Sequence, residues 1–139
     1  MIEFFSESGF ALTDVPVVRA WLIRSIQMEG CEPAHISYIF CDDAYLLDLN
    51  KRYLNHDFYT DVISFDYSGG KRLHADIFVS TERVCENAEK YKVAFSEELH
   101  RVLIHGLLHV MGYGDKNRRD RQAMRAKEEF YIDLLKCST

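Results

Sequence analysis

Apolar residues recur along the chain with two different spacings, and these spacings predict an alternation of strands and helices. Short runs rich in β-branched and aromatic residues predict four strands, at residues 2–5, 35–41, 61–67 and 73–79. Apolar residues three or four positions apart predict five helices, which begin near residues 14, 44, 81, 96 and 118. The expected fold is therefore α+β, a small mixed four-stranded sheet packed with about five helices.

Residues that start and stop helices support these boundaries. Thr13 or Asp14 can cap the first helix, which has Pro16 in its first turn and ends at Gly30. The expected N-caps of the other four helices are Asp42 or Asp43, Ser80 or Thr81, Ser96, and Asn117 or Asp120. A turn at residues 68–71 joins the third and fourth strands, and we expect these two strands to form a hairpin.

The fourth predicted helix carries the residues with the clearest chemistry. His105 and His109 are four positions apart, so their imidazoles lie on one helix face and can share one metal ion. Gly112 suits a left-handed C-terminal cap and Gly114 lets the chain fold back, which can bring Asp115 to the same point. Two nitrogens and one carboxylate oxygen leave a fourth position open for water, as in a catalytic zinc site. The alternative is that the histidines are hydrogen-bonded core residues and Asp115 is an ordinary turn residue.

Length and composition narrow the class of protein. A chain of 139 residues with 47% hydrophobic content fits one domain, residues 1–139, with a single core. No apolar run reaches the roughly 18 residues of a membrane span, and the N-terminus lacks the features of a signal peptide. The four cysteines are scattered, as is usual for small buried residues in a reducing compartment. We therefore expect a cytoplasmic protein without a membrane partner.

Charge is unevenly distributed along the chain. The net charge of −5 argues against indiscriminate binding to nucleic acids. However, the stretch from Lys116 to Lys127 contains six basic residues and one acidic residue, Asp120. Its local charge is therefore +5, and it lies just after the predicted metal ligands. A substrate with a phosphate backbone would need such a cluster, and Arg118, Arg119 and Arg121 are the candidate contacts. The alternative is a solvated helix face balanced by the acidic residues that follow it.

The stretch from His105 to Asp115 resembles the signature of the YbeY family of bacterial rRNA-maturation endoribonucleases. That signature reads His-Gly-x-x-His, then x-x-Gly-Tyr and a third metal-binding His. The family's other blocks are matched, in the same order, by Leu49-Asn50, Thr60-Asp61-Val62-Ile63-Ser64-Phe65 and Asp76-Ile77. This resemblance implies that the block from Thr60 to Phe65 shapes the cleft and holds the ligand histidines. Met124 and Glu128 fall where the family places Met and Glu, although Glu128 could equally be a surface charge.

The chain departs from the family pattern at two positions. Asp115 stands in place of the third histidine, at the same six-residue offset from His109. An alignment shifted by one residue would place Lys116 there, but a protonated lysine cannot bind a metal. A site with one carboxylate is one unit less positive than a site with three histidines, so we expect it to acidify bound water less. Leu54 occupies the place of a family arginine, and the phosphate-binding role of that arginine is therefore not transferred.

The resemblance implies a metal-dependent, single-strand-specific endoribonuclease that matures the 3′ end of 16S rRNA and acts in ribosome quality control. Its catalytic residues would be His105, His109 and Asp115, which act through one Zn²⁺; nickel, manganese or iron also suit this ligand set. Bound hydroxide, Asp61 or Asp76 would handle the proton. The expected partners are single-stranded rRNA and the small ribosomal subunit, and DNA is not expected.

Two other functions compete with this interpretation. The spacing of the histidines and Gly112 also matches zincin-type metalloproteases, whose metal helix carries a Glu directly after the first His. Here that position is Gly106, so the proton-accepting carboxylate is missing. Gly106 costs about 1 kcal/mol in a helix interior, and we therefore expect close packing against it. The third function is a non-catalytic ribosome-assembly factor with a structural metal, which the missing base and Leu54 favour.

Overall fold

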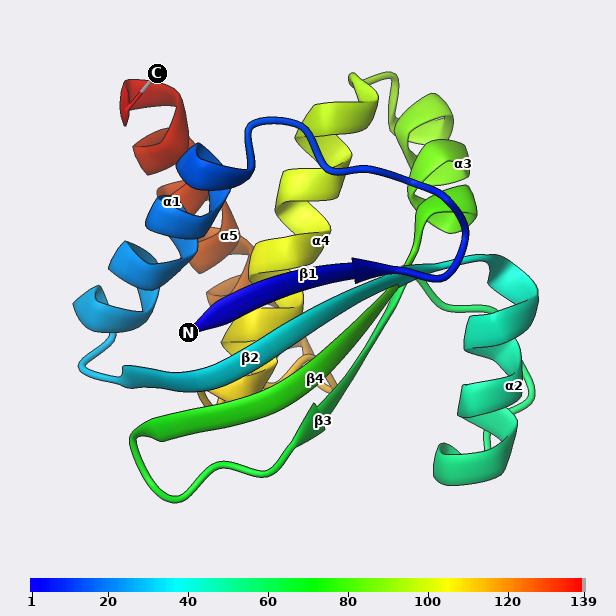
Figure 1. Cartoon of the computed structure of the whole chain (residues 1–139), viewed down its shortest axis with the longest axis horizontal. Coiled ribbons are helices and arrows are strands. Elements are labelled where there is room, and N and C mark those ends of the chain that lie inside the picture. The colour runs from blue at the N-terminus through cyan, green and yellow to red at the C-terminus, as the bar shows by residue number, and fades with distance from the viewer. Residues whose placement is uncertain (139) are drawn as a thin grey trace.

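The computed structural model describes residues 1–138, over which the chain forms a four-stranded sheet and five helices (Figure 1). The strands are β1 (Ile2–Ser6), β2 (Glu32–Cys41), β3 (Val62–Asp66) and β4 (Arg72–Ser80). The helices are α1 (Val15–Met28), α2 (Asp43–Leu54), α3 (Thr81–Tyr91), α4 (Phe95–Val110) and α5 (Arg118–Ser138). The predicted α+β fold and the predicted order of elements are confirmed.

The sheet is mixed, with the strand order β1-β2-β4-β3. β1 pairs with β2 and β2 pairs with β4 in parallel, whereas β3 and β4 form the predicted antiparallel hairpin. β2 begins three residues earlier than expected, and its register against β4 shifts between Pro33 and His35. β3 is therefore an edge strand, and it lies next to the helix that carries the histidine pair.

The sheet separates two hydrophobic cores. The larger core joins one face of the sheet to α1, α4 and α5, and it includes buried residues of α4 such as Leu103 and Leu107. The smaller core, centred on Cys41, Leu46 and Ile63, joins the other face to α2. Figure 1 shows α2 apart from the other helices, at one end of the sheet. Helix α4 is thus fixed by the main core.

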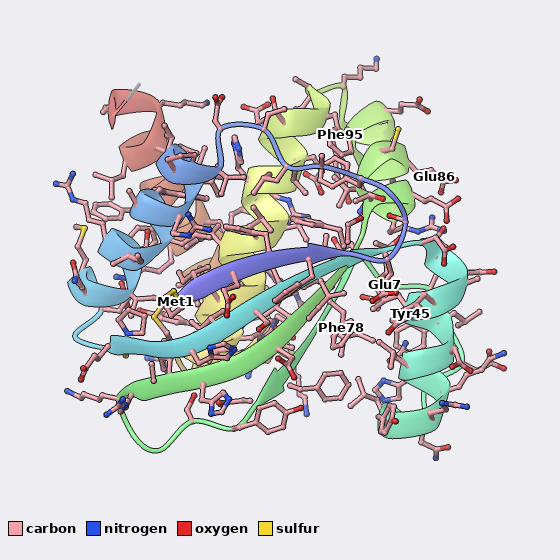
Figure 2. All side chains as sticks on the ribbon, in the orientation of Figure 1. Met1, Glu7, Tyr45, Phe78, Glu86 and Phe95 are labelled. Atoms are coloured by element: carbon pink, nitrogen blue, oxygen red, sulfur yellow. The ribbon has the colours of Figure 1, made fainter. Side chains whose placement is uncertain are left out.

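Contacts between aromatic rings attach α2 to its face of the sheet. The rings of Tyr45 on α2 and Phe78 on β4 are stacked with centroids 6.1 Å apart, and both residues are labelled in Figure 2. Phe65 on β3 meets Phe78 edge-on at 5.7 Å, and Tyr53 meets Phe65 at 5.8 Å. The last turn of α2 is therefore held beside β3.

Most of the predicted helix starts are confirmed. Asp42 and Ser80 each accept a hydrogen bond from the backbone N–H three residues later, at 2.8 and 3.2 Å. Asn117 accepts one from the N–H of Asp120 at 2.8 Å and so begins α5. These short side chains satisfy N–H groups that have no partner inside the helix.

Two expected caps do not form. Ser96 was expected to cap α4, but this is wrong, because the helix begins at Phe95 and Ala94 occupies the cap position without a side-chain hydrogen bond. The earlier start lets Phe95 pack on Phe10, with ring centroids 5.8 Å apart. Asp14 does precede α1, but it adopts a left-handed conformation (φ 54°) and makes no capping hydrogen bond. At α4, tertiary packing of Phe95 thus accompanies the loss of the local cap.

None of the helices in the described part of the chain has the length and apolar character needed to cross a membrane.

Candidate metal centre

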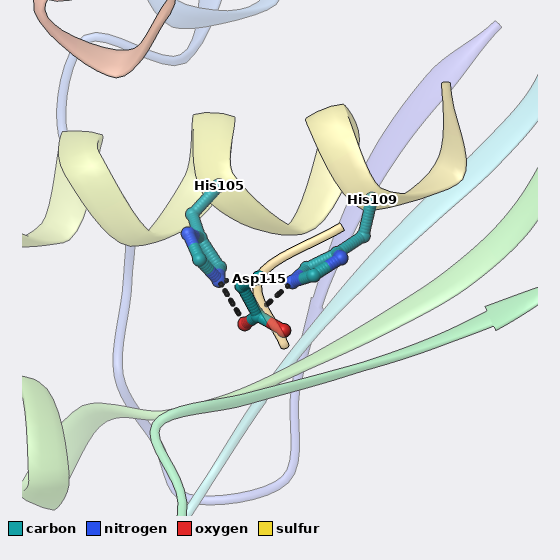
Figure 3. A group of neighbouring side chains, drawn as sticks. All are labelled: His105, His109 and Asp115. Carbon is teal, nitrogen blue, oxygen red and sulfur yellow. Dashed lines mark hydrogen bonds and ion pairs between the residues drawn. The ribbon is translucent and has the colours of Figure 1, made fainter. Parts of the chain in front are cut away.

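The side chains of His105, His109 and Asp115 converge at one point beside α4 (Figure 3). The Nε2 atoms of the two histidines are 3.1 Å apart, and Oδ2 of Asp115 lies 3.1 Å from Nε2 of His109 and 3.6 Å from Nε2 of His105. One potential ligand atom from each residue lies within 4.8 Å of the others. The structure thus brings together the three residues that the sequence pattern grouped, and Lys116 does not replace Asp115.

The turn after α4 delivers Asp115 to this point. Gly112 has a φ of 104°, which glycine adopts without strain, and it ends the helix as predicted. The N–H of Tyr113 donates to the carbonyl of Leu108 at 3.0 Å, and the chain then turns back past the histidines. Gly114 matters through close packing, because a Cβ atom there would lie 3.2 Å from Oδ2 of Asp120.

Gly106 lies between the histidines on the face of α4 that packs on the sheet. A Cβ atom at this position would lie 2.9 Å from Cγ2 of Ile77 and 3.0 Å from Cγ2 of Val62. The hydroxyl of Ser64 on β3 donates to the carbonyl of Gly106 at 3.0 Å. The expected close packing is confirmed, and the block that starts at Thr60 holds the histidine helix through Ser64.

Glu128 of α5 is buried beside the histidine pair and accepts a hydrogen bond from Nδ1 of His105, at 2.5 Å. The alternative of a surface charge is therefore wrong. Met124, Glu128, Tyr131 and Leu135 form the buried stripe of α5, so Glu128 lies on the packed face. A carboxylate at Nδ1 keeps the proton on that nitrogen and leaves Nε2 free to bind a metal.

Arg101, one helical turn before His105, connects this carboxylate to its surroundings. Its guanidinium lies 2.6 Å from Oε2 of buried Glu98, 3.5 Å from Oε1 of Glu128 and 3.3 Å from Oδ2 of Asp61. The hydrogen bond to Glu98 is the main reason why the pKa of Arg101 rises above its usual value. Arg101 is not among the residues predicted from the sequence, although its spacing of four from His105 places it on the same helix face.

The two carboxylates considered as proton acceptors lie in different places. Asp61 lies at the cleft, where Oδ2 accepts hydrogen bonds from Arg101 at 3.3 Å and from Asn87 at 3.4 Å. Asp76 lies on the other face of the sheet, because neighbouring Ile77 points towards α4 and successive side chains alternate. There it interacts with Tyr67. Asp76 as a proton acceptor at the cluster is therefore wrong.

The cluster opens into a cleft with a volume of about 490 Å³. Lys116 is the only lysine or arginine among the described residues that line it. Arg118, Arg119 and Arg121 are exposed near the start of α5 but are not part of the lining. Leu54 does line the cleft, so an apolar side chain occupies the place of the family arginine. A larger hollow of about 580 Å³ lies on the far side of Arg101 and Glu128 and does not include the cluster.

The donor set fits a first-row transition metal. Two imidazole nitrogens and a carboxylate oxygen are common ligands of zinc, and their side chains are 18%, 29% and 46% exposed. The cluster is therefore reachable from solvent. The fold and this cluster define an α+β protein with a helix-borne histidine pair that can hold a metal ion.

Comparison with known proteins identifies the family. A sequence model described as "Endoribonuclease YbeY" matches residues 13–136, and the chain belongs to this family. "Endoribonuclease YbeY" of Flavobacterium psychrophilum is 51% identical over 135 residues, which are 97% of this chain and 96% of the relative. The protein of the same name from Christiangramia forsetii is 50% identical over 134 residues, 96% and 94% of the two chains.

A solved structure supports the fold. The solution structure of TM1509 from Thermotoga maritima superimposes with a TM-score of 0.69 and covers 97% of this chain and 89% of its own. The two sequences are 24% identical, so this likeness concerns the fold alone.

Proposed function

We propose that this chain is a metal-dependent endoribonuclease that cleaves single-stranded RNA during the maturation of ribosomal RNA. The observation that carries the proposal is the convergence of His105, His109 and Asp115 in an open cleft. The family match supports the reaction class, since relatives with about half of their residues identical bear the name endoribonuclease. The proposed substrate is the 3′ end of 16S rRNA, and the proposed partner is the small ribosomal subunit.

The proposed metal is Zn²⁺, held by Nε2 of each histidine and by Oδ2 of Asp115. A divalent cation there would supply Lewis acidity, which polarises a phosphodiester and makes water a better nucleophile. Glu128 keeps the proton of His105 on Nδ1, so that Nε2 presents its lone pair to the cluster. Ser64 holds the helix between the two histidines, which keeps the ligands in register with the cleft.

Lys116 is the proposed contact for the phosphate that undergoes cleavage, because it lines the cleft next to Asp115. Arg118, Arg119 and Arg121 would contact RNA further along the strand, outside the cleft. We assign Asp61 a structural role, since its Oδ2 atom accepts hydrogen bonds from Asn87 on α3 and from Arg101 on α4 and so links the two helices. The proposed enzyme is one domain over residues 1–139 and acts in the cytoplasm, where its four free thiols would stay reduced.

The metalloprotease alternative loses further support at Gly106. Even a Cβ atom at that position would crowd Ile77 and Val62, so the glutamate that such enzymes need could enter only if these neighbours moved. The assembly-factor alternative predicts a protein that binds a metal but does not hydrolyse RNA. The following experiment distinguishes it from the endoribonuclease.

The test combines metal analysis with cleavage of a labelled single-stranded RNA. We expect wild-type protein to contain about one metal ion and to cleave the RNA, and His109→Ala to lose at least a hundredfold in rate. Glu32→Gln, an exposed change at the start of β2, is the control. RNA cleavage that survives both metal removal and His109→Ala would refute the proposal. Bound metal with neither RNA nor peptide cleavage would indicate an assembly factor.

A further inference from the structure

We propose that the loop between α2 and β3 carries a base-stacking subsite, in which Phe58, backed by His56, receives an unpaired nucleobase of the RNA. This inference rests on the proposed function and adds to it the residue that selects single strands. It concerns a part of the cleft that neither the metal ligands nor the basic residues account for.

Phe58 is an exposed aromatic residue inside the candidate active-site cleft. Its exposed fraction is 55%, and it lines the same cleft as the histidine pair and Lys116. The His56 ring is stacked on it, with centroids 5.1 Å apart and an interplanar angle of 22°. The imidazole stacks on one face of the phenyl ring, so the other face is the surface on which a base would stack. A large apolar surface open to water inside a cleft is a candidate ligand contact.

The loop is fixed by a buried polar side chain, so the backbone that carries this ring is held in place before any ligand arrives. Asn50 is 2% exposed, and its Nδ2 atom donates to the carbonyl of Phe58 at 2.8 Å. The carbonyl of Asn50 accepts from the N–H of His56 at 3.1 Å and from Asn55, which ends α2 in a left-handed conformation with φ 56°. The Leu-Asn block of the sequence therefore anchors the aromatic pair. Preorganisation of this kind lowers the entropic cost of binding.

The chemistry of the cleft matches the two halves of a nucleotide. The lining of the cleft combines the potential metal ligands and Lys116, which suit a phosphate, with the apolar and aromatic side chains of Leu54 and Phe58. Leu54 is apolar, so this part of the lining is suited to a flat base rather than to a second phosphate. Bases of single-stranded RNA are free to stack on aromatic side chains, whereas paired bases are already stacked in the duplex. The subsite would therefore favour single strands without reading their sequence.

The first test separates binding from chemistry in the metal-loaded enzyme. A base stack is worth about 1–3 kcal/mol, and 1.4 kcal/mol corresponds to a factor of ten. Phe58→Ala should therefore raise KM for a single-stranded RNA by about tenfold and change kcat much less. Phe58→Trp should retain the wild-type KM, whereas Phe58→Leu should resemble Phe58→Ala because it keeps apolar volume without a π face. Phe5→Ala, which removes a phenylalanine of similar exposure (49%) on β1, is the matched control.

The second test measures binding without catalysis. Metal-stripped protein in chelator is titrated with fluorescent single-stranded RNA, and with the same strand in which abasic nucleotides replace the central residues. We expect the wild type to bind the abasic strand about as weakly as Phe58→Ala binds the intact strand. The affinity of Phe58→Ala should be nearly the same for the two strands. Equal affinity of wild type and Phe58→Ala for the intact strand, with equal KM, would overturn the subsite. Binding that depends on Phe58 in a protein that never cleaves RNA would instead overturn the proposed function alone.

Discussion

At the scale of single residues, the contact between Glu128 and His105 decides which ring nitrogen faces the cluster. A buried carboxylate that accepts a hydrogen bond from Nδ1 orients the imidazole and increases the basicity of Nε2. Arg101 balances the negative charge of Glu128 and of Glu98. The ligand histidine is thus held by a chain of charged side chains that joins two helices.

Replacement of Glu128 by glutamine should weaken metal binding. The amide removes the negative charge beside Nδ1, and loss of such a partner typically costs 10–100-fold in metal affinity. We expect a loss of about tenfold for Zn²⁺, measured by competition with a chromogenic chelator. The matched control is Glu129→Gln, which changes the adjacent exposed carboxylate. Equal zinc affinity of the Glu128 variant and the wild type would show that this hydrogen bond does not support the site.

At the scale of elements, the central relationship is the packing of α4 on β3 and β4. Gly106 allows a close approach to Val62 and Ile77, and the hydroxyl of Ser64 contacts the helix backbone at the same place. The two histidines flank this contact, so the distance between the helix and the sheet also sets where the ligands point. The hairpin is therefore part of the support of the site.

Gly106→Ala should destabilise the protein although alanine is the better helix former. Overpacking against two stiff β-branched side chains costs about 1–3 kcal/mol, and helix propensity returns about 1 kcal/mol. We expect the free energy of unfolding in urea to fall by about 1 kcal/mol. Gly69→Ala is the control, since a Cβ atom there meets nothing within 4 Å. A stabilised Gly106→Ala protein would mean that the sheet yields easily at this contact.

At the scale of the whole molecule, Glu29 connects three distant segments. It follows α1, its side chain is 10% exposed, and it accepts hydrogen bonds from Tyr113, Tyr131 and Lys127. Burial alone would raise the pKa of Glu29, but the three hydrogen bonds together outweigh it and lower this pKa below 4.5. The contact ties the end of α1 to α5 and to the turn that presents Asp115.

Glu29→Gln should therefore reduce stability in a pH-dependent way. Hydrogen bonds to a charged group contribute about 1.5–3 kcal/mol, so we expect a loss of that order at pH 7. Because the folded state lowers the pKa, the stabilisation is present above the unfolded value of 4.5 and disappears as the pH falls through the folded value. Urea unfolding of both proteins at several pH values measures the difference. A difference that stays constant down to acidic pH would contradict this account.

The sequence predicted the fold class, the order of elements and the convergence of the histidines with Asp115. These features depend on local rules: alternation along a strand, the spacing of four in a helix, and a glycine that ends it. It misjudged Ser96 and Asp76 and left Glu128 undecided, because packing moved the start of α4, turned Asp76 to the far face of the sheet and buried Glu128.

By itself, the sequence determined which residues could meet within one helix and the turn that follows it, because chain geometry leaves little freedom over such short distances. Only the tertiary structure decided which residues support them. His105 meets Glu128 across 23 residues, Gly106 meets Ser64 across 42, and Asn50 fixes the backbone of Phe58, another residue that lines the cleft. Such partners depend on how helices and strands pack against one another, and no local spacing along the chain specifies that packing.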